Sequence, residues 1–177
     1  MFYLKIILVI AVAIILESLI SRYWAPFRYV DLALLVTIYF ALMRDPVTGM
    51  VTGYVAGFGA DLAPGAGPVI GVGGFSKTLI GFLIASIAVR FTLEGPLVRV
   101  IVIALSSLVD SALFIGLHNL MGQSLTSEAT PQVLAMKILF GAAANVVLGA
   151  ALFWVLDRVF PEQSRRGQMR VQRRFYD

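Results

Sequence analysis

The stretch that decides the fold is residues 30–62, VDLALLVTIYFALMRDPVTGMVTGYVAGFGADL. It holds two apolar runs, Val30–Met43 and Val47–Leu62, separated by Arg44-Asp45-Pro46. That charged break with its proline is a turn signal. One helix over the whole stretch would be far too long and would bury the break. The sequence therefore predicts two membrane spans here, although each is shorter than the ~20 residues that usually cross a bilayer.

Four further apolar stretches flank this pair: Leu4–Ile20, Ile70–Phe91, Leu97–Met121 and Gln132–Phe160. Of the 177 residues, 59% are hydrophobic and only 14% are charged, which is too little polar surface for a soluble domain. We predict an all-α integral membrane protein with six transmembrane helices over residues 1–160. The alternative count is five, with one of the two short runs re-entrant.

Charge sets the expected orientation. With the N-terminus cytoplasmic, ten lysines and arginines lie inside and only Arg22 and Arg28 lie outside, which satisfies the positive-inside rule. We expect both termini to be cytoplasmic.

The first stretch resembles a signal peptide, but its Ala11-Val12-Ala13 lies inside the apolar run, where a cleavage site would be badly placed. We therefore expect it to be an uncleaved first span.

Residues 161–177 form an Arg-rich segment that we expect to be a cytoplasmic tail. It carries five arginines and two acids. The simple interpretation is a stop-transfer flank, and the functional one is contact with anionic membrane lipids or an acidic partner. No nucleic-acid-binding fold accompanies the charge, so nucleic acid is not an expected partner.

Small residues recur at four-residue steps, which places them on one helix face. One ladder is Gly49, Gly53, Gly57 and then Asp61, and a second is Gly73, Lys77 and Gly81. A third ladder consists of Lys137, Gly141, Asn145 and Gly149. We expect Asp61, Lys77, Lys137 and Asn145 to project toward protein, because an unpaired charge facing lipid costs several kcal/mol. The glycine faces serve either partner docking or internal packing.

Most ionisable groups fall in the outer half of the predicted bundle, and four acids (Glu17, Asp31, Asp61, Asp110) face two lysines. One interpretation is structural ion pairing, such as Lys77 with Asp61 or Asp110. The other is a polar cleft open to the outside that binds a ligand or a partner segment. The candidate cleft residues are Asp31, Asp61, Lys77, Asp110, His118 and Lys137.

The sequence contains no convincing motif for an enzyme active site or a cofactor site. Residues 71–78 nearly match the phosphate-binding P-loop, but Ser76 replaces the second glycine and no strand precedes the run. Asp110 and His118 share a helix face with several serines, an arrangement more typical of packing than of a catalytic triad. The chain has no cysteine and one histidine, which excludes thiolate sites and disfavours histidine metal sites. We therefore expect no enzymatic activity, no metal and no cofactor.

The order of motifs resembles a known family. The segment from Val30-Asp31-Leu32 to Tyr39-Phe40-Ala41-Leu42 is similar to the second-span signature of the MreD rod shape-determining membrane proteins. That family then has a glycine-rich helix ending in an aspartate, here Gly49 to Asp61, and a glycine-rich loop, here Gly65 to Gly71. The specific match covers residues 30–82; beyond them, only length and hydropathy match.

The resemblance implies a non-enzymatic protein of the bacterial inner membrane. MreD-like proteins bind the single-span protein MreC and belong to the cell-elongation machinery with MreB, RodA and a class B penicillin-binding protein. The resemblance also implies a bundle similar to the substrate-binding subunits of vitamin ECF transporters. Such a subunit is the alternative function, and an outer cleft lined by Asp61, Lys77, Asp110 and Lys137 would be its binding site.

Overall fold

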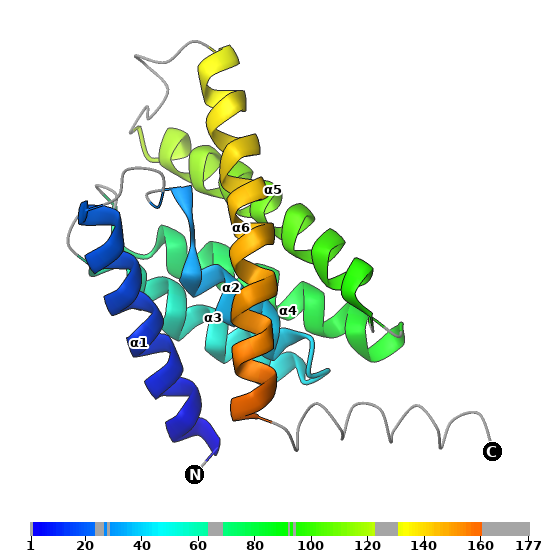
Figure 1. Cartoon of the computed structure of the whole chain (residues 1–177). Coiled ribbons are helices and arrows are strands. Elements are labelled where there is room, and N and C mark those ends of the chain that lie inside the picture. Colours follow the sequence, from blue (N-terminus) through cyan, green and yellow to red (C-terminus); the bar gives the residue numbers. More distant parts are fainter. Residues whose placement is uncertain are drawn as a thin grey trace.

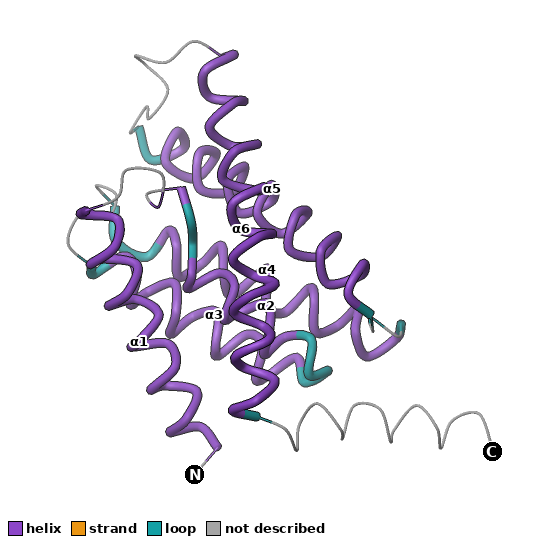
Figure 2. Tube along the Cα trace, viewed as in Figure 1, coloured by secondary structure: helices purple, strands orange, loops and turns teal. Residues whose placement is uncertain are grey.

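The computed structural model describes residues 2–23, 27, 29–63, 69–91, 93, 95–122 and 131–160. These residues form six α-helices and no strand (Figures 1 and 2). The helices are α1 Phe2–Tyr23, α2 Leu32–Ala41, α3 Pro46–Asp61, α4 Val72–Arg90, α5 Pro96–Leu120 and α6 Pro131–Val159. The all-α prediction is confirmed. The tail predicted over residues 161–177 lies outside the described residues.

Four of the described helices, α1, α4, α5 and α6, are long and apolar enough to cross a membrane, which indicates a membrane-embedded protein. The two runs that flank Arg44 are shorter. Helix α2 has 10 residues and α3 has 16, so they span about 15 Å and about 24 Å of a ~30 Å hydrocarbon core. The expected run Val30–Met43 thus contains a helix only half a membrane long. The count of six spans stays a prediction.

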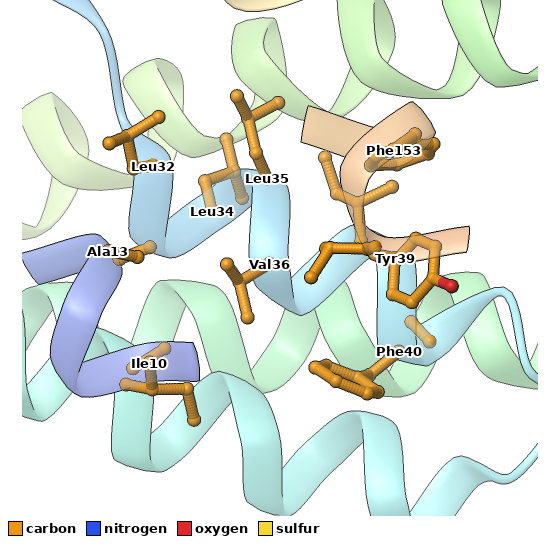
Figure 3. Close-up of a cluster of buried hydrophobic side chains, with 14 of the residues drawn as sticks. Ile10, Ala13, Leu32, Leu34, Leu35, Val36, Tyr39, Phe40 and Phe153 are labelled. Carbon is orange, nitrogen blue, oxygen red and sulfur yellow. The ribbon is translucent and has the colours of Figure 1, made fainter. Parts of the chain in front are cut away.

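Helix α2 lies at the centre of the bundle, and all ten of its residues are buried. It contacts each of the other five helices. Figure 3 shows Leu34, Val36 and Phe40 of α2 packed among Ile10 of α1 and Phe153 of α6. A helix that is apolar on every side needs such a location. The shortness of α2 is therefore compatible with its stability, because protein rather than lipid surrounds it.

Helices α3 and α4 pack backbone to backbone through the first glycine ladder. A Cβ atom added at Gly49 would lie 2.6 Å from the carbonyl oxygen of Gly81, and one at Gly53 would overlap the carbonyl of Lys77. Gly57 faces Gly73 in the same way. Because α4 already covers this face, internal packing is the interpretation that the structure confirms. Docking of a partner helix on Gly53 and Gly57 is not compatible with it.

The turn between α2 and α3 combines one uncommon backbone conformation with a well-capped helix start. Arg44 adopts a positive φ of 67°. Asp45 then caps α3: its carboxylate accepts a hydrogen bond from the Val47 backbone N–H at 3.2 Å and another from the Thr48 hydroxyl. Pro46 occupies the first turn, where its missing N–H costs nothing. The predicted break at residues 44–46 is thus a real helix boundary.

Asp157 joins three helices at the end of the bundle where α6 ends. Its carboxylate accepts hydrogen bonds from Nη1 of Arg99 on α5 at 2.8 Å and from the Tyr39 hydroxyl on α2 at 3.1 Å. Figure 1 shows that the start of α1 lies at this same end, whereas the end of α5 and the start of α6 lie at the opposite one. The polar side chains around the start of α2, described next, lie toward that opposite end.

Candidate functional site

The start of α2 is buried inside the bundle, and side chains from two distant helices satisfy its backbone. The first N–H groups of a helix have no partner within it. Leu32 N–H donates to Oε2 of Glu17 on α1 at 2.9 Å, and Leu34 N–H donates to Oδ1 of Asp31 at 2.6 Å. Asp31 N–H donates to Oδ1 of Asn145 on α6 at 2.9 Å. These contacts fix α1, α2 and α6 relative to one another.

Lys77 is the cation at the centre of this cluster and is only 4% exposed. Its Nζ lies 2.7 Å from Oδ2 of Asp31 and 3.5 Å from Oδ2 of Asp110. The Ser76 hydroxyl donates to the other oxygen of Asp110 at 2.7 Å. One ammonium therefore serves two carboxylates from different helices. The predicted Lys77–Asp110 pair is confirmed, but its shortest contact, with Asp31, was not foreseen.

Asp61 does not pair with Lys77, contrary to one of the pairs expected. Its Oδ2 accepts hydrogen bonds from the backbone N–H groups of Gly71, Gly73 and Gly74 at 2.8, 3.0 and 3.2 Å. The carboxylate thus caps the N-terminus of α4, where the helix dipole favours a negative charge. The P-loop-like run at residues 71–78 does present backbone N–H groups to an anion, but that anion is a side chain of the chain itself.

The second and third ladders also pack internally. Asn145 is buried, and its Nδ2 donates to the Ser107 hydroxyl on α5 at 3.1 Å. Gly141 faces the carbonyl of Tyr29, and Gly149 faces Ile103 of α5. The inward placement predicted for Asn145 is confirmed, and its face of α6 contacts both α5 and the segment before α2.

One predicted cleft residue lies outside the cleft, and a second is exposed instead of projecting inward. His118 is fully buried rather than lining a cleft; its Nδ1 lies 2.9 Å from the Phe114 carbonyl, and its Nε2 has no hydrogen-bond partner among the described residues. Lys137 is exposed rather than inward, and it makes no ion pair with any described residue. Lys137 lies about one helical turn before Gly141 and two turns before Asn145. It is therefore outside the part of α6 whose contacts bury those two residues, which explains its exposure.

A cavity of about 490 Å³ lies over this cluster. Its volume falls within the range of small-molecule sites, about 300–1,000 Å³. Its polar lining includes Asp31, Asp61, Lys77, Asp110, Lys137 and Asn145, together with Glu17, Ser107 and Ser111. Its apolar lining includes Tyr29, Leu34, Phe114, Ile115, Leu134 and Ile138. The structure thus brings together five of the six predicted cleft residues, without His118.

Sequence reasoning named Glu17 but did not place it in the cleft; it recognised Ser107 only as part of a polar stripe and Ser76 only as a departure from the P-loop. An acid within an otherwise apolar span is itself a signal of an inward-facing group, and Glu17 has that signal. The two serines carry no comparable signal, since serine is common in membrane helices. Among the described residues, no three His, Cys, Asp or Glu side chains are arranged to hold a metal ion.

The position of the cavity along α6 follows from helix geometry. Asn145 precedes Arg158 by thirteen residues, which is about 20 Å along the axis, and Lys137 lies about 12 Å farther. The cavity thus extends from the middle of the longest helix to its first turns.

No protein-family model, curated protein or solved structure matches the chain.

Proposed function

We propose that the protein is a non-enzymatic membrane scaffold of the bacterial cell-elongation complex, which binds MreC through its transmembrane helices. The observation that carries the proposal is the role of residues 30–61. The segment that resembles the MreD signature builds the fully buried helix α2 and the glycine face of α3. The resemblance therefore rests on the residues that determine this fold rather than on incidental hydropathy.

The proposal places the MreC contact outside the glycine ladder, because α4 occupies that face. Among the described residues, α1 and α6 carry the most exposed large apolar side chains; for example, Ile7 and Leu8 on α1 and Val147 on α6 are exposed. A single-span partner would pack along one of them by close van der Waals contact. MreB, RodA and the penicillin-binding protein would join through that assembly.

The test is depletion of the protein in a rod-shaped bacterium that encodes it. Loss of rod shape supports the scaffold, whereas normal shape with impaired uptake of a vitamin contradicts it. Photo-crosslinkers at Leu8 and at Val147 would then locate MreC, with a buried position such as Ile103 as the matched control. Crosslinking from neither exposed face would refute the proposed mode of binding.

The cavity favours a second candidate, the substrate-binding subunit of a vitamin-type ECF transporter. It has the volume and the polar floor that such a ligand needs. A thermal-shift screen with vitamins tests it, because a ligand that binds only the folded state raises its stability. Neighbouring genes for an ATPase and transporter subunits, in place of shape genes, would also support it.

A further inference from the structure

Most ionisable side chains around the cavity already have partners within the protein. Lys77 lies between Asp31 and Asp110, so these three groups form one cluster. Asp61 is bound by three backbone N–H groups at the start of α4, and Oε2 of Glu17 accepts hydrogen bonds from two at the start of α2. None of these five groups therefore calls for a ligand of opposite charge.

Lys137 is the exception. It lines the cavity and is exposed, and it makes no ion pair with any described residue. It lies about 12 Å along α6 from Asn145, which contacts the cluster at the floor. That separation exceeds the Debye length of about 8 Å in physiological salt, so the charges of the floor act only weakly at Lys137. The mouth of the cavity therefore suits a single anionic group such as a carboxylate.

The floor keeps hydrogen-bonding capacity that the protein does not use. Nδ2 of Asn145 donates one of its two hydrogens to Oγ of Ser107. The other amide hydrogen and the Ser107 hydroxyl hydrogen have no acceptor among the described residues, and Oε1 of Glu17 accepts no hydrogen bond from them. Glu17 and Asn145 bind the N–H groups of the adjacent residues Leu32 and Asp31, so these unused atoms lie close together.

A neutral amide complements this floor. Its carbonyl oxygen would accept from Ser107 and Asn145, and its N–H would donate to Glu17. If Glu17 is protonated, its hydroxyl donates to the amide carbonyl instead, so the match does not depend on the charge of that residue. Unused polar atoms in a buried site favour a ligand that pairs with them over one that is apolar throughout.

The wall between floor and mouth is apolar. Phe114 on α5 and Ile138 on α6 each lie seven residues from the contact between Ser107 and Asn145, which is about 10 Å toward the mouth (Figure 1). The side chain of Lys137 leaves α6 toward the start of that helix, so its ammonium lies at or beyond the level of this wall. A ligand that reaches from floor to mouth therefore needs an apolar middle.

We propose that the cavity binds a small carboxylic acid whose other end is a neutral amide. The amide lies at the floor against Ser107, Asn145 and Glu17, a short hydrocarbon chain lies along Phe114, and the carboxylate lies at Lys137. Each part of the ligand then meets a surface of its own kind. The inference goes beyond the proposed scaffold, and its test is a binding measurement whose outcome is separate from the depletion phenotype.

The probe is 6-acetamidohexanoate, in which five methylenes separate an amide from a carboxylate. Hexanoate lacks the amide, and N-hexylacetamide lacks the carboxylate. The full chain is placed in phosphatidylcholine nanodiscs, and the dissociation constant of each compound is obtained from the rise of the melting temperature with its concentration. The probe should bind at least about fivefold more tightly than either of the other two, because each lost end removes about one hydrogen bond or exposed ion pair.

The variant Lys137→Gln should weaken binding of the probe about fivefold and leave binding of N-hexylacetamide unchanged. It alters an exposed side chain, so it should fold. Ser107→Ala should weaken the probe and N-hexylacetamide but not hexanoate. Lys5→Gln removes the same charge from an exposed site on α1 outside the cavity, and this matched control should change nothing. Equal affinity for all three compounds, no binding of the probe, or unaltered probe binding in Lys137→Gln would overturn the proposal.

Discussion

The contact between α3 and α4 leads to a sharp prediction for Gly53→Ala. The added methyl group would overlap the carbonyl of Lys77, which is backbone on a rigid helix and cannot rotate away. Either the helices separate or the backbone shifts, and overpacking of this kind costs about 1–3 kcal/mol. Better helix propensity returns at most about 1 kcal/mol. We expect a net loss of roughly 1–2 kcal/mol in the free energy of unfolding.

Two glycines in the same chain serve as matched controls. A methyl group at Gly116 meets no atom within 4 Å, so Gly116→Ala should leave stability unchanged or raise it. At Gly59 the neighbour is the flexible end of Ile14, so Gly59→Ala should cost less than Gly53→Ala. Reversible unfolding in mixed micelles measures all three. If Gly53→Ala is as stable as Gly116→Ala, the close backbone contact does not exist and the reasoning fails.

Three further substitutions test the polar cluster and the opposite end of the bundle. Lys77→Met should lower the free energy of unfolding by about 3–5 kcal/mol, because it leaves two carboxylates without their cation. Adding Asp110→Asn should restore part of that loss in the same unfolding assay, and strict additivity of the two changes would contradict a shared network. Asp61→Ala should cost about 0.5–2 kcal/mol by removing the α4 cap, and hydrogen exchange at Gly73 should rise; unchanged protection there would refute the cap. Asp157→Asn should cost less than roughly 1 kcal/mol, because its pair with Arg99 is about one-third exposed; a larger loss in the unfolding assay would show that Asp157 contributes more than a surface pair.

The helices could be predicted from sequence because their signals are local. The break at Arg44-Asp45-Pro46 separates α2 from α3, and each of the six apolar stretches coincides with one helix to within a few residues at each end. The spacing of Gly49, Gly53 and Gly57 predicted a close-packed face but could not show which helix it meets. A four-residue repeat identifies one face of a helix, but it does not tell which other helix packs against that face.

The site was predictable in composition but not in pairing. An inward direction for Lys77 follows from the cost of exposing a charge to lipid. The choice of Asp31 over Asp61 as its partner depends on where α2 starts, and that start is set by contacts with Glu17 and Asn145 from distant parts of the chain. The inward direction predicted for Lys137 was wrong, because the ladder pattern continues into the first turns of α6, where most residues are exposed.

The buried α2 has a consequence for biogenesis. Leaving the translocon early, a segment of ten helical residues is too short to remain across a bilayer alone. Its first turn also needs the amide of Asn145, which the ribosome delivers more than a hundred residues later. The contact that completes the start of α2 can therefore form only after α6 has been made, so the buried centre of the bundle is finished late in synthesis.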